Sequence, residues 1–193
     1  MIEVEKKFKI TEEALAKLTA GAEFLGVKTF TDICYDDASY SLSTTDRWLR
    51  SRDGVFEFKV RFDAKDSSHM DRYYELHDAE IRRELKLPPK GSLAEAIAAA
   101  GYIPCAQYTT TRKKYTKDGF GIDIDSMDFG YHIGEIELMV PEDETHEATA
   151  RILAFAKSYG LEIQNVRGKL IEYICRYKPA HRAALKKAGF WSV

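Results

Sequence analysis

Charged residues recur at every second position in several short segments of this 193-residue chain. Acidic residues do so in residues 3–5, 123–125 and 135–137, where the sequences are Glu-Val-Glu, Asp-Ile-Asp and Glu-Ile-Glu. Basic residues do so in residues 50–52 and 59–61, which read Arg-Ser-Arg and Lys-Val-Arg. A period of two places alternate side chains on one face of a β-strand, so each segment predicts a strand with one charged face.

These charged faces contain residue types that suit a metal ion and a polyphosphate. Carboxylate oxygens are hard ligands that suit Mg²⁺ or Mn²⁺, and five acids could supply them: Glu3, Glu5, Asp123, Glu135 and Glu137. Basic side chains suit phosphate oxygens, and six could supply them: Lys7, Arg50, Arg52, Lys59, Arg112 and Lys169. A divalent cation that bridges the acids to a polyphosphate would neutralise both sets, which is the arrangement of a phosphoryl-transfer site.

The elements that must position these residues are strands in the first 140 residues and mainly helices afterwards. Strand patterns cover residues 2–10, 23–36, 47–52, 55–61, 72–77, 103–116, 120–128 and 132–140. Asp53-Gly54 and Asp118-Gly119 are two-residue turn signals, so the strands that they join should pair antiparallel. Helices are predicted after the N-cap residue Thr11, over residues 79–85, 92–100, 146–159 and 169–177, and from Pro179 onward.

Two arrangements of these strands are possible. An open antiparallel sheet with one solvated face explains the alternation in any single strand. The signs are segregated, however, with acids on the first and last two strands and bases on the middle hairpin and around Arg112. A solvated face usually mixes the signs. About eight strands can close into a barrel whose charged faces turn inward. We therefore predict an α+β fold, an eight-stranded antiparallel closed β-barrel with helices packed on the outside through stripes that include Leu15, Leu18, Ile152, Leu153 and Phe155.

Composition excludes several other classes of protein. With 31 acidic and 29 basic residues the net charge is −2, which argues against a generic nucleic-acid-binding protein. Three widely spaced cysteines fit neither a zinc site nor a disulfide framework, and they favour a reducing compartment. No apolar run approaches the roughly 18 residues of a membrane span, and the charged N-terminus lacks a signal-peptide core. We expect one cytoplasmic domain over residues 1–193, monomeric, without nucleic-acid or membrane partners.

The order of the motifs resembles that of the CYTH family, the triphosphate tunnel metalloenzymes. Residues 3–7, Glu-Val-Glu-Lys-Lys, match the family signature ExExK. The companion motifs follow in the family order, in residues 48–52, 57–59, 111–112, 123–125, 134–137 and 168–169. The likeness covers nearly the whole chain and is greatest to the animal thiamine triphosphatase branch, above all in residues 122–131 and 29–32.

This resemblance implies a tunnel that binds a triphosphate and requires Mg²⁺, with Mn²⁺ as a possible substitute. It implies that Glu3, Glu5 and Glu137 hold a first metal ion, and that Asp123 and Glu135 hold or tune a second. It assigns the phosphate oxygens to the six bases named above, with Lys59 and Lys7 as the catalytic side chains. The implied reaction is hydrolysis of thiamine triphosphate to thiamine diphosphate and phosphate.

Trp48 bears on the choice of substrate. It precedes Arg50 by two residues, so its side chain should face the same cavity. It either fills the core or stacks on the cationic thiazolium or the pyrimidine of thiamine, since tryptophan offers the best cation–π face. Three other functions remain open: an inorganic tripolyphosphatase of the same fold, a class-four adenylate cyclase, and a non-catalytic module that binds triphosphates or polyphosphate.

One residue departs from the family pattern. The family reads Asp-x-Tyr-Tyr-Asp where residues 32–36 read Asp-Ile-Cys-Tyr-Asp, so Cys34 replaces the first tyrosine. In some relatives this tyrosine pairs with a tunnel lysine in an acid–base role. Lys59 is present, and Tyr35 should point to the opposite face of the strand. The departure concerns the proton-transfer step and leaves the predicted metal and phosphate ligands in place.

Overall fold

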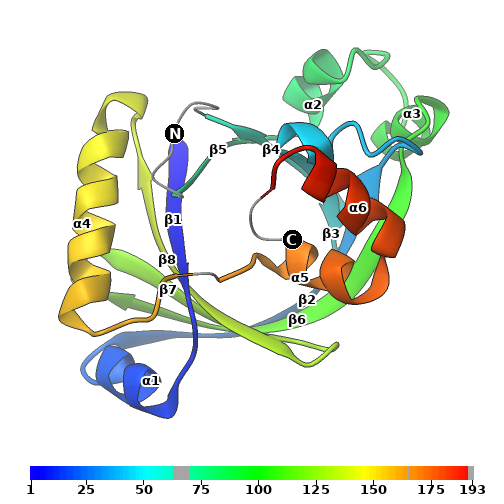
Figure 1. The fold of residues 1–193 in the computed structure, drawn as a ribbon. Coiled ribbons are helices and arrows are strands. Elements are labelled where there is room, and N and C mark those ends of the chain that lie inside the picture. The colour runs from blue at the N-terminus through cyan, green and yellow to red at the C-terminus, as the bar shows by residue number, and fades with distance from the viewer. Residues whose placement is uncertain (63–69, 165, 191–193) are drawn as a thin grey trace.

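The computed structural model describes residues 1–62, 70–164 and 166–190. Eight strands make up its framework (Figure 1). They are β1 (Ile2–Phe8), β2 (Glu23–Asp36), β3 (Arg47–Arg52), β4 (Val55–Arg61), β5 (Asp71–Leu76), β6 (Ile103–Lys117), β7 (Phe120–Met127) and β8 (Tyr131–Val140). These bounds lie within two residues of the predicted strands, because the alternation of side chains is a local signal that each segment carries alone.

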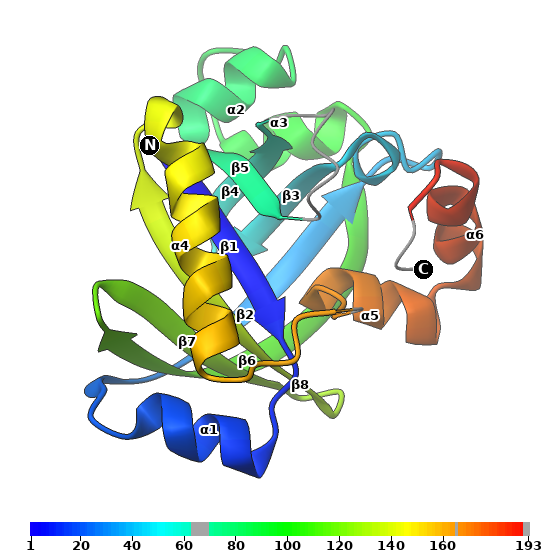
Figure 2. The ribbon, with the colours of Figure 1, turned by 60° about the vertical axis from the view of Figure 1, so that its left-hand side comes forward.

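The strands form a ring in the order β1-β5-β4-β3-β2-β6-β7-β8, with every pair antiparallel (Figures 1 and 2). The first strand is hydrogen-bonded to β5 on one side and to β8 on the other, so the sheet returns to its starting strand. The predicted turns join β3 to β4 and β6 to β7. Asp53, Gly54, Asp118 and Gly119 all have positive φ, as a type I′ turn requires.

The apolar faces of the strands point away from the ring and are covered by helices. In α4 (Thr145–Ser158), Ala148, Ile152 and Phe155 are buried at helical spacing and pack against β1 and β8. Figure 2 shows α4 lying along the outside of β1. Leu153 was expected on this stripe, but it is 37% exposed, because position 153 turns away from the 148–152–155 face.

The helix α1 (Glu12–Thr19) begins as predicted. The Thr11 hydroxyl accepts a hydrogen bond from the Ala14 N–H at 3.1 Å, and Leu18 is fully buried beneath the helix. The remaining helical segments are η1 (Ser43–Thr45), α2 (Asp78–Glu84), α3 (Leu93–Ala99), η2 (Glu142–Glu144), α5 (Lys169–Tyr177) and α6 (Pro179–Lys187). The last two helices lie together at one end of the ring (Figures 1 and 2). None of the helices in the described ranges is both long and apolar enough to cross a bilayer.

The charged faces point into the ring, which decides between the two arrangements left open by the sequence. Glu3, Glu5, Asp123 and Glu135 are all less than 9% exposed, which a solvated sheet face would not produce. The fold therefore places acids and bases from distant parts of the chain around one interior space.

Candidate active site

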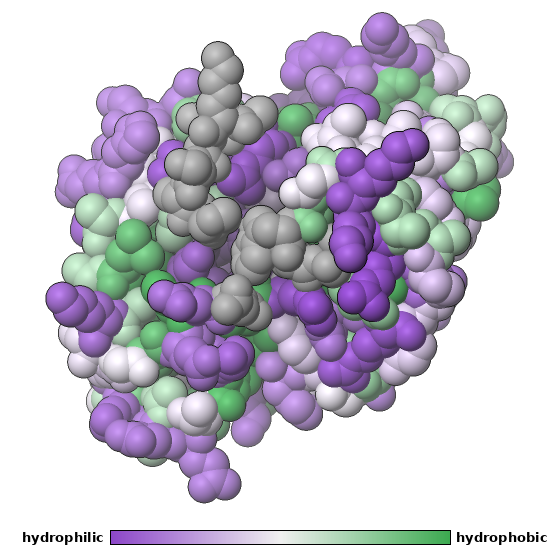
Figure 3. Space-filling view, in the orientation of Figure 1, coloured by the Kyte–Doolittle hydropathy of each residue, from purple (hydrophilic) through white to green (hydrophobic). Residues whose placement is uncertain are grey.

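A cavity of about 740 Å³ occupies the interior of the ring and opens beside α5 and α6. Eleven of the twelve predicted site residues line it: Glu3, Glu5, Lys7, Trp48, Arg50, Arg52, Lys59, Arg112, Glu135, Glu137 and Lys169. Asp123, the twelfth, is completely buried beneath Arg112. Figure 3 views this end of the molecule, where hydrophilic residues gather on the visible surface over α5 and α6.

Four carboxylates sit on facing positions of three adjacent strands. Glu5 of β1 lies directly opposite Glu137 of β8, and Glu135 of β8 lies opposite Asp123 of β7. Directly opposed residues on one face have Cβ atoms about 5 Å apart. Gly121 faces Glu137, and a Cβ atom at this glycine would lie only 2.8 Å from the Glu137 Cγ. The missing side chain therefore leaves the space that the Glu137 carboxylate occupies.

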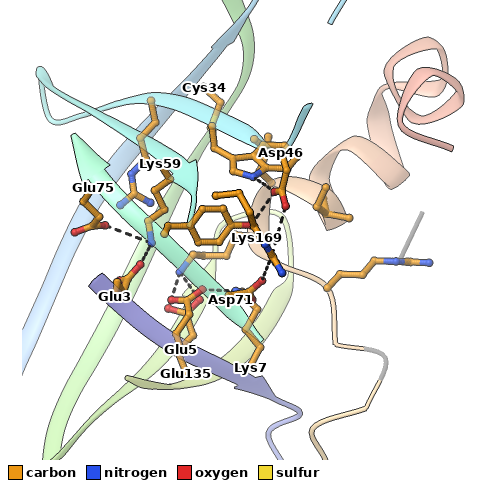
Figure 4. Close-up of a pocket in the computed structure, with 18 of the residues that line it drawn as sticks. Glu3, Glu5, Lys7, Cys34, Asp46, Lys59, Asp71, Glu75, Glu135 and Lys169 are labelled. Atoms are coloured by element: carbon orange, nitrogen blue, oxygen red, sulfur yellow. Dashed lines mark hydrogen bonds and ion pairs between the residues drawn. The ribbon is translucent and has the colours of Figure 1, made fainter. Parts of the chain in front are cut away.

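Lysines engage the acids on the β1 side of the cavity (Figure 4). The Lys59 ammonium donates to Glu3 and lies 3.3 Å from the Glu75 carboxylate. The Lys7 ammonium donates to Glu5 and, at 2.6 Å, to Asp71. Each of these lysines thus bridges a predicted metal ligand to an acid on β5.

A second network spans the β7–β8 side. Arg112 donates two hydrogen bonds to Asp125, at 2.7 and 2.6 Å, and a third to Glu135 at 2.8 Å. The Lys169 ammonium, from the first residue of α5, lies 2.6 Å from Asp125 and 3.0 Å from Glu135. Lys169 is 8% exposed, so the start of α5 carries a buried cation into the ring.

The environment raises the pKa of two of the predicted metal ligands. Burial raises the pKa of Glu3 to about 7, although the Lys59 charge opposes the change. Burial likewise raises the pKa of Asp123 to about 6, against the Arg112 charge and with a further contribution from Glu137. The neighbouring positive charges therefore do not fully offset the effect of burial on these two carboxylates.

The donor set fits a divalent metal ion. The acids supply hard oxygen ligands, and the fully buried Asp123 carboxylate forms an ion pair with Arg112 and lies 3.3 Å from the Lys114 ammonium. Within residues 1–62, 70–164 and 166–190, no three acidic, histidine or cysteine side chains already surround a common point. Each acid is turned toward a lysine or arginine instead, so metal binding requires those cations to move toward another anion, such as a phosphate.

Arginines of β3 face the same cavity and are held by acids that the sequence-based site prediction did not include. Arg50 donates to Glu57 at 2.8 Å, and Arg52 donates to Asp32 at 2.8 and 3.1 Å. The acids Asp71 and Glu75 of β5 were missed as well. A period of two along β5 could have identified that pair, because Asp71, Tyr73 and Glu75 alternate with Arg72 and Tyr74.

Trp48 lies at the end of the cavity nearest α6. Its indole N–H donates to the Asp46 carboxylate at 2.7 Å, and its ring meets Phe190 edge-on with centroids 6.0 Å apart. The Tyr73 hydroxyl donates to the same Asp46 oxygen at 2.8 Å. Asp46 lies between η1 and β3, outside any alternating pattern, so no periodic signal pointed to it.

Cys34 lies in the cavity wall, and its Sγ is 3.9 Å from the Tyr108 hydroxyl. The thiol is 2% exposed, and burial raises its pKa to about 12, so it is neutral at physiological pH. Tyr35 packs outside the ring in a cluster with Leu49 and Phe58, as the alternation predicted. Tyr35 therefore does not replace the missing tyrosine inside the cavity.

Comparison with known proteins identifies the family. A thiamine-triphosphatase from Homo sapiens is 31% identical over an alignment of 201 positions, which covers 93% of this chain and 86% of the human one. A solved structure from Pyrococcus horikoshii OT3 superposes with a TM-score of 0.65 at 23% identity, over 90% of this chain and 99% of that one. A Hippeastrum protein, described as a putative adenylyl cyclase with a dominant triphosphatase activity, superposes at 0.54 and 16% identity, over 91% of this chain and 94% of that one.

The family model of the CYTH domain matches residues 1–167, which include every strand of the ring. The match and the identity to the human enzyme agree with the order of motifs along the sequence. This chain belongs to the CYTH family.

Proposed function

We propose that this protein hydrolyses thiamine triphosphate to thiamine diphosphate and phosphate with Mg²⁺ as cofactor. The observation that carries the proposal is one cavity lined by Glu3, Glu5, Glu135 and Glu137 together with lysines and arginines, with Trp48 at its end. The 31% identity to a thiamine-triphosphatase supports this substrate. The dominant triphosphatase activity of the Hippeastrum protein supports the reaction class.

Glu3, Glu5 and Glu137 would hold one Mg²⁺ ion, and Asp123 and Glu135 would hold or tune a second. When bound, Mg²⁺ would neutralise charge on the terminal phosphate as water attacks it. Mn²⁺ offers the same charge with a similar preference for oxygen ligands.

Arginine and lysine side chains would hold the triphosphate once they exchange their present carboxylate partners for phosphate oxygens. Arg50, Arg52 and Arg112 each present a planar fork that matches two phosphate oxygens. Lys169 would close the cavity from α5, because it already reaches Asp125 and Glu135 inside the ring.

Lys7 and Lys59 would act as cations rather than as bases. Burial would lower the pKa of the Lys59 ammonium, but the charges of Glu3 and Glu5 raise it above its ordinary value. The pKa of Lys7 is raised for the same reason, chiefly by Asp71 and Glu5 against burial. Both side chains are therefore protonated at neutral pH, so they can hold the terminal phosphate and neutralise the charge that develops on the departing diphosphate oxygen.

Phosphate release with Mg²⁺ tests the proposal, with thiamine triphosphate, inorganic tripolyphosphate and ATP at matched concentrations. Thiamine triphosphate should be hydrolysed best. Glu5→Gln should abolish the reaction, whereas Glu12→Gln, on the exposed side of α1, should leave it intact. Preference for tripolyphosphate would identify an inorganic tripolyphosphatase, and tight binding without turnover would identify a non-catalytic module.

A further inference from the structure

Asp46 joins two aromatic side chains of the cavity wall through one carboxylate oxygen. That oxygen accepts the Trp48 indole N–H at 2.7 Å and the Tyr73 hydroxyl at 2.8 Å. The other oxygen lies 3.4 Å from an Arg61 guanidinium nitrogen. Figure 4 shows Asp46 beside the cavity with these contacts drawn as dashed lines. A single side chain thus fixes both rings relative to each other.

The backbone at Asp46 is arranged for this contact. The residue ends η1 with φ 57° and ψ 43°, the left-handed region that non-glycine residues other than asparagine and aspartate rarely adopt. This conformation brings its carboxylate back toward Trp48, two residues along the chain. Residues 44 and 45 of η1 also line the cavity, so this short segment forms part of its rim.

The second ring that Asp46 holds faces the predicted catalytic cation. The Lys59 ammonium lies 5.9 Å from the centroid of the Tyr73 ring, and the Arg61 guanidinium lies 5.6 Å from it. Asp46 therefore connects the proposed recognition side chain, Trp48, to the wall beside Lys59. A tryptophan ring attracts a cation only over its face, so its orientation decides whether it recognises one.

We infer that Asp46 is a positioning residue that determines specificity for triphosphates with an organic cationic head group, by holding the Trp48 ring face toward the cavity. The inference rests on the proposed function. In this account the residue that ends η1 orients the Trp48 indole, while the inward faces of the strands bind the phosphates. Removing the Asp46 oxygen frees the indole to rotate, since this bond restrains its χ2 torsion.

Two substitutions separate the contact from the backbone conformation. Asp46→Gly keeps the left-handed conformation and removes the acceptor, whereas Asp46→Asn keeps both the conformation and an acceptor oxygen. Asp118→Gly is the matched control, because Asp118 has the same conformation (φ 52°) in the exposed β6–β7 turn. The measured quantity is kcat/KM for thiamine triphosphate divided by kcat/KM for tripolyphosphate.

The ratio should fall about tenfold in Asp46→Gly, mainly through a higher KM for thiamine triphosphate, because the head-group contact is lost. It should recover to within about twofold of wild type in Asp46→Asn, and Asp118→Gly should match wild type. An unchanged ratio in Asp46→Gly, or a loss that Asp46→Asn does not restore, would overturn the inference.

A fluorescence titration keeps this test separate from that of the proposed function. In a Trp191→Phe background Trp48 is the only remaining tryptophan, and thiamine diphosphate is the probe. Thiamine diphosphate should quench the Trp48 emission of the protein with Asp46 intact. The quenching should be weaker in Asp46→Gly and should be restored in Asp46→Asn. If wild type prefers tripolyphosphate, the proposed function fails. Equal emission and quenching in the Gly variant and wild type would then refute the positioning role independently.

Discussion

Trp48 is the residue whose chemistry differs most from the charged side chains around it. A bare tripolyphosphate gains nothing from an aromatic face, whereas a thiazolium cation over tryptophan gains about 1–2 kcal/mol. The indole borders the cavity and is restrained at its N–H by Asp46. We therefore expect the side chain to affect the choice of substrate more than the reaction itself.

Trp48→Ala should lower kcat/KM for thiamine triphosphate roughly five- to thirtyfold, the equivalent of the lost cation–π energy. The same variant should change kcat/KM for tripolyphosphate by less than about twofold, since no phosphate contact is removed. Steady-state kinetics on both substrates measure this difference. A parallel loss on both would assign Trp48 to packing.

Cys34 should be chemically inert despite its place in the cavity wall. Its thiol pKa is raised to about 12 by burial, so almost no thiolate exists at about pH 8. Peptide mapping after iodoacetamide treatment of the folded protein should find Cys34 unmodified, and Cys34→Ala should retain turnover. Rapid alkylation of Cys34 with loss of activity would instead make it a nucleophile or a substrate contact.

At the scale of elements, the strands and the direction of their faces follow from the sequence. The period of two in residues 3–5, 123–125 and 135–137 predicts each strand and its charged face, since that signal is local. The inward direction of the charged faces was inferred from the segregation of the signs and the number of strands. The ion-pair partners are not local. Asp71 meets Lys7 only because β5 pairs with β1, although 64 residues separate them in sequence. Such contacts depend on the register of the ring and could not be predicted from one strand.

Two glycines of adjacent strands offer a matched test of how the ring is built. A Cβ at Gly134 would lie 2.0 Å from the Phe8 ring in the outer core, whereas one at Gly121 would meet the Glu137 side chain at 2.8 Å. Gly134→Ala should destabilise the fold by about 1–3 kcal/mol through overpacking. Gly121→Ala should displace a carboxylate and reduce turnover while leaving stability nearly unchanged. Denaturant unfolding and phosphate release would distinguish them, and the reverse pattern would contradict this assignment.

His181 anchors α6 to η1 and should make stability depend on pH. Its Nε2 lies 2.7 Å from the Ser43 hydroxyl, and its ring stacks on Tyr40. Burial lowers its pKa, although the Asp36 charge opposes this, so the unfolded chain binds a proton more readily than the folded chain. His181 therefore makes its full contribution to the free energy of unfolding above about pH 6.5. This contribution is lost as the pH falls toward the lower pKa of the folded state.

Denaturant unfolding at a series of pH values measures this contribution. The difference in unfolding free energy between wild type and His181→Gln should shrink as the pH falls from about 7 to about 5. Both proteins contain the same acids, such as Glu3, whose raised pKa changes stability with pH in the opposite sense. Taking the difference between the two unfolding free energies removes the contribution of these acids. A difference that stays constant over this range would contradict the contribution.

For the whole molecule, closure of the strands into a ring explains how a chain with a net charge of −2 forms two charged sets at one place. The sequence shows the signs segregated along the chain. The ring then brings acids of β1, β7 and β8 to face bases of β3, β4 and β6. Much of the cavity lining could be predicted because the inward faces of β1, β3, β4 and β8 carry charged residues, whereas Asp71 and Glu75 of β5 were missed. The role of Asp46 at the rim of the cavity could not be predicted, because the direction of its side chain depends on a left-handed backbone conformation that no sequence repeat encodes.

The most direct test of the proposed activity is a competition in one tube. Thiamine triphosphate and inorganic tripolyphosphate are mixed at equal concentration with Mg²⁺ and the protein, and both substrates are followed by chromatography. Their relative rates of loss give the ratio of kcat/KM values without separate calibration. We predict that thiamine triphosphate disappears first and that thiamine diphosphate accumulates. Faster loss of tripolyphosphate, with thiamine triphosphate left intact, would contradict the proposed substrate.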